Sequence, residues 1–302
     1  MPPPAGLPVD PVVASPEARL RPLSELPWQR LAPLRGLLTD IDDTLTREGT
    51  IEPEALAALH ALRAAGLAVI AITGRPARWS EPFVQAWPVA AIVAENGGVM
   101  LRLEHGRIRH DYTTDDATRV ANAHRMAACA AAVQAEVSGA ALARDSAGRL
   151  TDIAVDHSEF SHLDEARIAQ VVAVMRRHGL TATVSSIHIN GWIGGHSKWT
   201  GAHWAVQALT GEPLQPDRWL YVGDSTNDQE MFERLPLTVA VANIARFVPQ
   251  LRALPGYVTS AERGRGFAEV AQAVLEAKLD EVAKAAGGRP HGFAQAADQS
   301  GA

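Results

Sequence analysis

Short apolar runs alternate with amphipathic segments along most of the chain. Residues 37–39, 67–72 and 90–94 are rich in aliphatic side chains and end in turn-forming or polar residues, which is typical of buried parallel strands. Between the first two runs, residues 53–65 carry leucines at helical spacing, and Gly66 stands where a helix would end. Strands that alternate with helices predict an α/β fold, a doubly wound parallel sheet (Rossmann-like) with right-handed crossovers.

After about residue 104 the pattern changes to that of a separate α+β module. The elements expected in it are a long alanine-rich helix over 115–137, a strand around 151–156, a helix over 163–178 and a strand around 183–190. The strand and helix rhythm then resumes. The elements expected there are a helix over 198–209, strands at 219–222 and 237–241, and a last helix over 266–285.

The sequence therefore predicts an α/β core that is interrupted by an α+β cap. Residues 27–103 and 196–286 would form the core, and residues 104–195 the cap. The proline-rich leader at 1–26 and the Gly/Ala/Gln-rich tail at 287–302 are both expected to be disordered. A chain of 302 residues is long enough for two hydrophobic cores.

Composition narrows the class of partner. The formal net charge of −6 gives no sign of the basic patch that nucleic-acid binders carry, so we expect no nucleic-acid partner. The single cysteine, Cys129, excludes a disulfide framework within the chain. There is no secretory signal pattern, and no uncharged apolar run approaches the roughly 20 residues of a membrane span. We expect a soluble cytoplasmic protein without a membrane partner.

Carboxylates follow two of the expected strands. Asp40, Asp42 and Asp43 come after the first strand, and Asp224 and Asp228 come after a later one. Ligands of parallel sheets bind outside the carboxyl ends of the strands, so both clusters are expected at one place. Mg²⁺ prefers oxygen ligands and is typically held by one or two carboxylates plus substrate phosphate, which suits Asp40 and Asp224. Taken alone, each cluster also fits an acidic turn or a helix cap.

A second group of residues suits a phosphate dianion. Thr73 and Gly74 follow the second strand, and Lys198 stands near the start of an expected helix. They offer a hydroxyl, backbone N–H groups and a cation. Each has an ordinary alternative, a turn or a solvated surface lysine. Their occurrence in order at successive junctions of one parallel sheet favours a phosphate site.

These segments resemble the four motifs of the haloacid dehalogenase-like hydrolases. The motifs read here Asp40-Ile41-Asp42-Asp43-Thr44-Leu45, Thr73-Gly74-Arg75, Lys198, and Gly223-Asp224-Ser225-Thr226-Asn227-Asp228. The resemblance covers about 35–103 and 196–283. The segment between them is similar to the type IIB cap of the Cof-like and sugar-phosphate phosphatases, and Asn96-Gly97 also resembles that subclass. The third motif departs from the pattern, because Trp199 follows the lysine where many relatives carry glycine.

The resemblance implies catalytic roles for five residues. Asp40 would be the nucleophile that forms an aspartyl-phosphate. Asp42 would be the general acid that protonates the leaving group and then the general base that takes a proton from water. Thr73, the amide of Gly74 and Lys198 would hold the transferring oxygens, because phosphoryl transfer is catalysed chiefly by positioning and charge stabilisation.

The resemblance also implies Mg²⁺ as the cofactor. Its ligands would be the carboxylate of Asp40, the main-chain carbonyl of Asp42 and the carboxylate of Asp224. Asn227 and Asp228 would support this metal site. The metal would let an anionic nucleophile approach an anionic phosphate.

Candidate substrate contacts lie on the last strand expected in the cap. Alternation there predicts a polar face with Ser186, His188 and Asn190, and an apolar face with Ile187 and Ile189. We expect the polar face to cover the site, although an exposed sheet face would show the same pattern. Two residues of the core, Arg75 and Asn96, are expected to contact the substrate from the side opposite the cap.

The predicted function is a Mg²⁺-dependent phosphatase that acts on a small phosphorylated metabolite, a sugar phosphate or a phosphorylated glycoside. A sugar phosphomutase is the close alternative, because it would share the nucleophile and the cap type. A non-catalytic phospho-ligand-binding protein is an alternative of another class, and the intact Asp40, Asp42, Lys198 and Asp224 argue against it. Neither a Gly-x4-Gly-Lys-Ser/Thr loop nor a dinucleotide fingerprint is present, which disfavours a kinase or nucleotide hydrolase.

Overall fold

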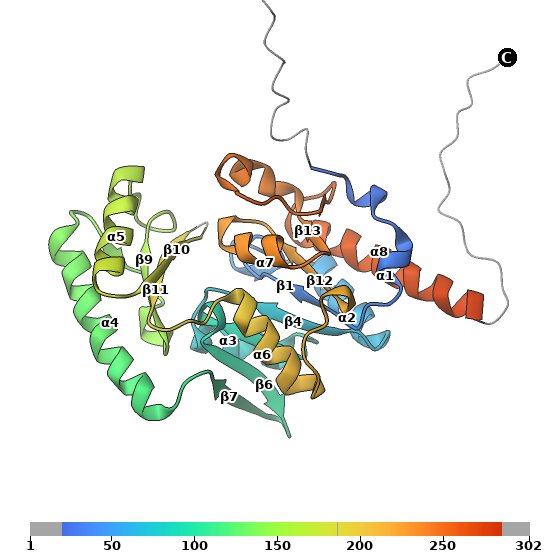
Figure 1. The fold of residues 1–302 in the computed structure, drawn as a ribbon, viewed down its shortest axis with the longest axis horizontal. Coiled ribbons are helices and arrows are strands. Elements are labelled where there is room, and N and C mark those ends of the chain that lie inside the picture. The colour runs from blue at the N-terminus through green and yellow to red at the C-terminus, as the bar shows by residue number, and fades with distance from the viewer. Residues whose placement is uncertain (1–19, 186, 286–302) are drawn as a thin grey trace, which may run out of the picture.

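The computed structural model of the protein describes residues 20–185 and 187–285. Most of the leader and all of the tail predicted to be disordered, residues 1–19 and 287–302, lie outside the described residues, as does Ser186. Figure 1 shows a large α/β body with a smaller lobe beside it.

Residues 20–26, predicted to be disordered with the leader, have a defined place in the structure. Pro22 forms a parallel bridge with Val258, and the N–H of Val258 donates to the carbonyl of Arg21 at 2.8 Å. Leu26 is buried in the main core. The prediction was wrong here because a segment without periodicity can still dock on the edge of a sheet through backbone hydrogen bonds.

The large body is built on an eight-stranded sheet formed within the described residues, in the order β14-β13-β12-β1-β4-β5-β6-β7. The bounds of its strands are β1 Gly36–Thr39, β4 Ala68–Ile72, β5 Ala91–Ala94, β6 Val99–Glu104, β7 Arg107–Tyr112, β12 Trp219–Gly223, β13 Thr238–Ala240 and β14 Tyr257–Val258. A small hairpin of β2 (Thr46–Arg47) and β3 (Thr50–Ile51) follows β1. The strands predicted at 37–39, 67–72, 90–94, 219–222 and 237–241 are confirmed.

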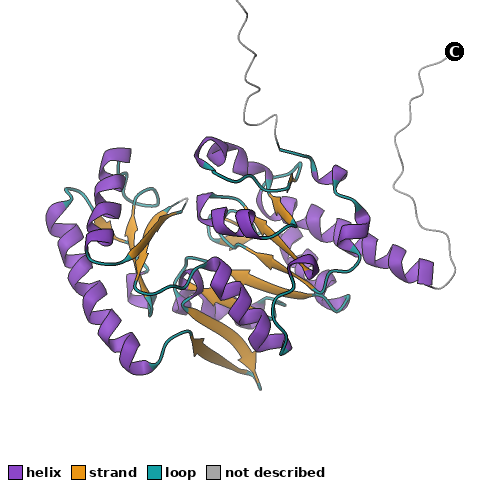
Figure 2. Cartoon of the chain, viewed as in Figure 1, coloured by secondary structure: helices purple, strands orange, loops and turns teal. Residues whose placement is uncertain are grey.

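Helices cover both faces of this sheet (Figure 2). The bounds are α1 Trp28–Leu31, α2 Pro53–Ala64, α3 Ala77–Ala86, α6 Lys198–Thr210, α7 Gln229–Arg234 and α8 Arg263–Ala285. The shorter 3-10 helices are η2 Leu23–Glu25, η3 Glu95–Gly97, η5 Pro216–Arg218, η6 Thr226–Asp228 and η7 Ala242–Gln250. Successive strand residues point to opposite faces, so both faces need apolar side chains. Leu37 packs with α2 and α8, whereas Leu38 packs with α6 and α7. The predicted doubly wound α/β fold is confirmed.

Two antiparallel strands extend the sheet beyond its parallel part. The pairs from β14 to β5 are parallel, whereas β5–β6 and β6–β7 are antiparallel. A division of the chain at residue 104 would give β7 to the cap, but its pairing places it in the core sheet. The strand lies at the edge of the sheet and most of its residues are charged or polar, so it lacks the apolar run that identified the buried strands.

The smaller lobe comprises the elements between β7 and α6. Its four-stranded sheet, as described, has the order β10-β11-β9-β8, with bounds β8 Ala141–Leu142, β9 Asp152–Asp156, β10 Thr181–Val184 and β11 His188–Trp192. Its helices are α4 Asp116–Glu136, η4 Ser146–Gly148 and α5 Glu165–Arg177. Helices α4 and α5 pack on one face through Cys129, Val155 and Ile189, so the other face is free to meet the large body. We refer to this lobe as the cap.

The last cap strand is a hairpin and not the single strand predicted at 183–190. Strands β10 and β11 pair antiparallel, with Val184 opposite Ile189. Ser185 closes the turn, since its N–H donates to the carbonyl of His188 at 2.9 Å. The sequence carries two serines here, which are a weaker turn signal than glycine or proline and also fit a strand face.

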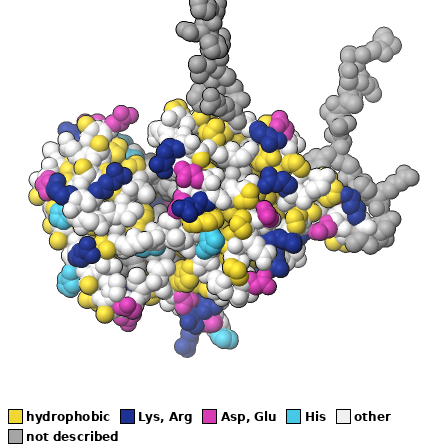
Figure 3. All heavy atoms as spheres, viewed as in Figure 1, with side chains coloured by type: hydrophobic (Ala, Val, Ile, Leu, Met, Phe, Trp, Pro, Cys, Tyr) yellow, Lys and Arg dark blue, Asp and Glu magenta, His cyan; other side chains and the backbone are white. Residues whose placement is uncertain are grey.

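None of the helices over residues 20–185 and 187–285 combines the length and apolar character needed to cross a membrane. On the face seen in Figure 3, basic and acidic side chains are interspersed.

Candidate active site

Strand order brings the predicted motifs to one edge of the sheet. Strand β1 lies between β12 and β4, and all three run parallel, so their carboxyl ends meet. Asp40 follows β1, Thr73 follows β4 and Asp224 follows β12. Lys198 is the first residue of α6 and reaches the same edge. The four motifs therefore lie around one point.

Lys198 joins the two acidic clusters. Its Nζ donates to Asp40 Oδ1 at 2.6 Å and to Asp228 Oδ1 at 2.7 Å, and it lies 3.3 Å from Asn227 Oδ1. Lys198 and Asp40 are each 3% exposed. Ser197 caps α6 through a capping box with Thr200, which fixes the helix start from which the lysine extends. A buried ammonium between two carboxylates keeps its proton, and their charges raise the pKa of Lys198 against the effect of burial.

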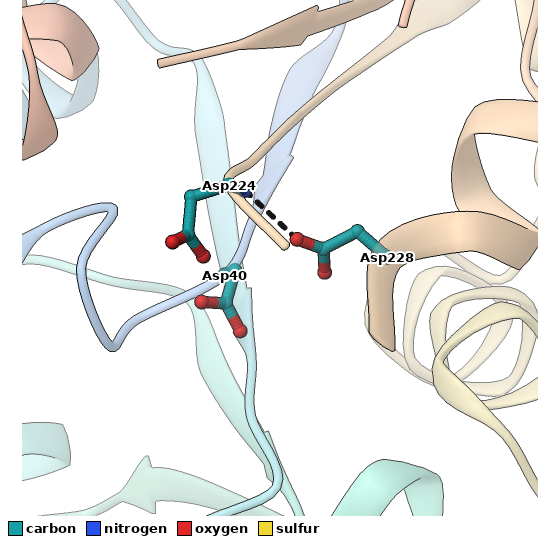
Figure 4. Close-up of side chains that lie close together, drawn as sticks. All are labelled: Asp40, Asp224 and Asp228. Carbon is teal, nitrogen blue, oxygen red and sulfur yellow. Dashed lines mark hydrogen bonds between the residues drawn. The ribbon is translucent and has the colours of Figure 1, made fainter. Parts of the chain in front are cut away.

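Asp228 is held by donors on both carboxylate oxygens. Oδ1 accepts from Lys198 and from the hydroxyl of Tyr221, which rises from β12 beneath the site. Oδ2 accepts from the backbone N–H of Asp224 at 2.8 Å (Figure 4). It also accepts from the backbone N–H of Ser225 at 3.0 Å. Asp228 therefore fixes both the lysine and the loop that carries Asp224.

Asp224 differs because one of its oxygens lacks a partner among the described residues. Oδ2 accepts from Asn243 at 2.9 Å and from Arg246 at 3.4 Å. Oδ1 is buried, and within the part of the chain that the structure describes it has no hydrogen-bond partner. Ligand atoms of Asp40, Asp224 and Asp228 all lie within 4.8 Å of one another (Figure 4). This set of hard oxygen donors fits a divalent cation such as Mg²⁺.

The pKa values in this cluster reflect the crowding of negative charge. Burial raises the pKa of Asp40 to about 7, with Lys198 acting in the opposite direction and Asp228 and Asp42 adding to the rise. Burial and the charges of Asp40 and Asp228 raise the pKa of Asp224 well above its usual range. A cation placed between Asp40 and Asp224 would favour both ionised forms, which is a second reason for the fit.

Asp42 has a different partner from Asp40. Arg75 Nε lies 3.1 Å from both Asp42 oxygens, and the guanidinium also lies 3.5 Å from Asp145 and Glu159 of the cap. Burial raises the pKa of Asp42, while Arg75 lowers it. A raised pKa is what a carboxyl group needs to carry a proton to a leaving group.

The loop after β4 carries Thr73 and Gly74, which the sequence predicts to contact phosphate. Thr73 is fully buried, and its Oγ1 accepts from the N–H of Arg75 at 3.0 Å, which leaves its hydroxyl proton free to donate elsewhere. Gly74 packs closely, since an added Cβ would lie 3.3 Å from the Asn96 amide and 3.4 Å from Asn190 Oδ1. Asn96 is 3% exposed, with its Nδ2 unpartnered among the described residues. Asn96 therefore lies beside the loop that carries Thr73 and Gly74.

The cap is bound to this loop through buried polar groups. The carbonyl of Gly74 accepts from Arg149 at 2.9 Å and from Asn190 at 3.3 Å, and both of these donors also bind Asp152. Glu95 of the core accepts the N–H groups of Leu150 and Thr151 and so holds the same cap segment. None of Arg149, Asp152 and Glu95 was predicted, because single charged residues give no periodic signal.

A small cavity lies between the cap and the acidic cluster. Its volume is about 20 Å³, room for roughly one water. Its lining includes the predicted residues Asp40, Asp42, Thr73, Gly74, Arg75, His188, Asn190 and Asn227. Ile187, predicted on the opposite face from His188 and Asn190, lines it as well. That prediction was wrong because Ile187 belongs to the turn, where strand alternation does not apply.

His188 and Asn190 project from β11 toward the core, as expected of the polar face. His188 Nε2 lies 2.9 Å from Glu159, and burial lowers the pKa of its imidazole to about 4, so the ring is neutral. Ser186, predicted on the same face, lies outside the described residues.

A wider cleft opens beside the cavity, between the β10–β11 hairpin and the helices α6 and α7. Its volume is about 760 Å³, and its lining includes Asn96, Trp192, Lys198 and Asn227. The cleft therefore shares Asn227 with the small cavity and reaches the lysine of the acidic cluster.

Comparisons with known proteins point to one family of hydrolases. The family model described as haloacid dehalogenase-like hydrolase matches residues 37–136. The phosphoglycolate phosphatase of Methanoculleus marisnigri is 30% identical over 219 residues, which are 70% of this chain and 85% of that protein. The phosphoglycolate phosphatase of Methanothermobacter thermautotrophicus is 25% identical over 237 residues, 78% of this chain and 96% of that protein.

A solved structure shows the same fold. The sucrose-phosphatase of Synechocystis, in complex with sucrose and phosphate, matches with a TM-score of 0.59. The match covers 80% of this chain and 98% of that one at 16% sequence identity. At this identity the likeness supports the architecture of core and cap and carries no information on the ligand.

Proposed function

From the premise that the chain belongs to the haloacid dehalogenase-like hydrolases and is a phosphatase, we propose that it hydrolyses a small phosphomonoester through an aspartyl-phosphate on Asp40, with Mg²⁺ as cofactor. The observation that carries the proposal is the grouping of Asp40, Lys198 and Asp224 at one strand edge, with a carboxylate oxygen of Asp224 unpartnered among the described residues. Such an arrangement can bind a phosphate and attack it.

In the first step a carboxylate oxygen of Asp40 attacks phosphorus, and the bond to the leaving oxygen breaks. Asp42 donates its proton to that oxygen, which its raised pKa allows. The hydroxyl of Thr73, the N–H of Gly74 and the ammonium of Lys198 hold the phosphoryl oxygens in place. In the second step Asp42 removes a proton from water, the water oxygen attacks phosphorus, and the bond from phosphorus to Asp40 breaks, which releases inorganic phosphate and restores the Asp40 carboxylate.

Asp40, the main-chain carbonyl of Asp42 and Asp224 would hold the Mg²⁺. The ion supplies positive charge that offsets repulsion between the carboxylate and the phosphate. Asp228 and Asn227 support the site from behind, because both accept from Lys198 and Asp228 also holds the backbone of Asp224.

The leaving group is proposed to be small. The cavity over Asp40 holds roughly one water, so substrate entry requires the cap to move away from the loop after β4. Sugar phosphates, which the sequence favours, and phosphoglycolate, which names the two relatives, are the first compounds to assay. Phosphate release measured beside isomer formation separates hydrolysis from phosphomutase activity.

Replacement of the nucleophile tests the proposal. Asp40→Asn is expected to lower phosphate release by about 10⁴-fold or more. Its circular dichroism spectrum and unfolding midpoint are expected to stay those of a folded protein. Asp43→Asn is the matched control, because Asp43 lies in the same stretch and binds Arg246 and Arg263 instead. Normal turnover by Asp40→Asn would overturn the nucleophile assignment.

A further inference from the structure

Asn243 lies where three parts of the site's scaffold meet. It is the second residue of η7, directly after β13, and is 7% exposed. The segments around it are the loop that follows β1, the end of β12 and the start of α8. No motif that carries the family resemblance includes it.

The side-chain amide of Asn243 forms hydrogen bonds to all three segments, as donor and as acceptor. Nδ2 donates to Asp224 Oδ2 at 2.9 Å and to the main-chain carbonyl of Asp43 at 3.0 Å. Oδ1 accepts from the N–H of Arg263 at 3.0 Å. The two protons of one amide therefore tie the carboxylate of Asp224 to the loop that carries Asp40 and Asp42.

This contact decides which oxygen of Asp224 is left free. Because Oδ2 is occupied by Asn243, Oδ1 is the oxygen left available to a cation bound with Asp40. Oδ1 is the atom that is buried without a partner in the described structure. Arg246 also reaches Oδ2, at 3.4 Å, but its side chain is 45% exposed and it binds Asp43 as well. Asn243 is thus the buried donor that fixes the orientation of Asp224.

We propose that Asn243 is a positioning residue of the metal site. It presents Oδ1 of Asp224 to Mg²⁺, and it holds the Asp43 loop at the distance from Asp224 at which both can serve the metal site. The inference rests on the proposed Mg²⁺ site and adds to it a residue that binds neither metal nor substrate. Partners of this kind orient metal ligands, and their loss typically lowers metal affinity by about 10–100-fold.

The test measures Mg²⁺ binding to the full chain by calorimetry, without substrate. Asn243→Leu keeps a similar shape and removes the donor, so Mg²⁺ affinity is expected to fall by about 10–100-fold. Arg263→Ala is the matched control. It removes a contact to Asp43 Oδ1 at 2.8 Å on the same scaffold but does not touch Asp224, so affinity is expected to stay within about twofold.

The comparison of the two variants distinguishes a positioning role of Asn243 from a general contribution to the stability of the scaffold. Weak binding by Asn243→Leu alone, with turnover restored at high Mg²⁺, supports the proposal. Affinity equal to that of the wild type, or an equal loss in both variants, overturns it. If Asn243→Leu does not fold, Asn243→Ser is measured with the same expectation. Absence of Mg²⁺ binding by the wild-type protein would instead reject the metal site itself, so the two failures are distinguishable.

Discussion

Asp40 and Asp42 are separated by one residue but have different surroundings. Asp40 contacts Lys198 at 2.6 Å, whereas Asp42 accepts from Arg75 at 3.1 Å on both oxygens. An ammonium beside a carboxylate favours a nucleophile, and a buried carboxyl with a raised pKa favours a proton donor. The neighbouring Asp43 binds Arg246 and Arg263, and these contacts outweigh burial and lower its pKa. One short loop thus holds three carboxylates in three environments.

The proton-donor role of Asp42 predicts a dependence on the leaving group. Asp42→Asn should slow hydrolysis of an alkyl phosphate by about 10²–10⁴-fold, because an alkoxide needs a proton to depart. The loss should be much smaller for formation of the enzyme intermediate from p-nitrophenyl phosphate, whose leaving group departs as an anion. Rapid-quench kinetics on both substrates measure this difference, and equal losses would rule out the assigned role.

His196 predicts a pH dependence of stability. Its ring stacks on Trp192 with centroids 5.4 Å apart, its Nε2 is unpartnered among the residues described, and burial lowers its pKa from 6.5 to about 4. Between these two pH values the unfolded chain binds a proton that the folded protein does not, so folding stability falls as the pH falls. The loss should reach roughly 2–3 kcal/mol at about pH 4.5.

Urea unfolding from pH 7.5 to 4.5 measures this effect. His196→Leu should show a flatter pH dependence than the wild type. The exposed His124 provides the control, since His124→Ala should leave the slope unchanged. Parallel curves for the wild type and His196→Leu would contradict the assignment.

At the scale of elements, the β10–β11 hairpin closes the site. Its turn places Ile187 over the small cavity, while His188 and Asn190 reach it from the start of β11. Thr226 of the core donates to the carbonyl of Val184 at 2.9 Å, which anchors the hairpin on the catalytic edge. The lining of the small cavity therefore comes from a turn as well as from a strand face.

This geometry predicts a change of specificity. Ile187→Ala should raise kcat/KM for a hexose phosphate relative to phosphoglycolate by about 10-fold, because it removes side-chain volume that lines the cavity. Initial rates with both substrates give the ratio. Ile189→Val is the control, since Ile189 packs in the cap core and its shortening should lower stability without altering the ratio. An unchanged ratio for Ile187→Ala would mean that the turn does not limit the substrate.

At the scale of the whole molecule, the catalytic groups come from segments far apart in the sequence. Asp40 and Lys198 are 158 residues apart in the sequence because the cap lies between them, and they meet because α6 starts at the sheet edge where β1 ends. Asp40, Asp224 and Asp228 crowd three buried carboxylates together, and Oδ1 of Asp224 has no partner among the described residues, so their burial is costly. A bound cation would relieve this cost, so cofactor binding and folding stability should be coupled.

Removal of the metal tests this coupling. Exhaustive chelation should reduce hydrolysis to background, and added Mg²⁺ should restore it. At a concentration of about 100 times Kd, Mg²⁺ should raise folding stability by about 2.7 kcal/mol. Thermal unfolding with and without Mg²⁺ measures the shift, and Asp224→Ala should show little of it. Full activity after chelation would count against the metal site.

The sequence by itself determined the family, the phosphatase class and the α/β fold. Buried parallel strands need continuous apolar runs, and catalytic carboxylates directly after such runs form a local pattern that a sequence displays. The motif residues Asp40, Thr73, Lys198 and Asp224 could be identified in this way, and the fold brings them together. Their assignment to the metal and the substrate remains a prediction.

Only the tertiary structure decided which single polar residues complete the site. Asn243, Tyr221 and Arg149 lie outside the four motifs, and each acts through one hydrogen bond or a few to a residue of another element or loop. The antiparallel β7 likewise had no apolar run to mark it, and the turn at Ile187 had neither glycine nor proline. Periodicity records which face of an element is buried, whereas a contact between two polar side chains depends on the packing of whole elements.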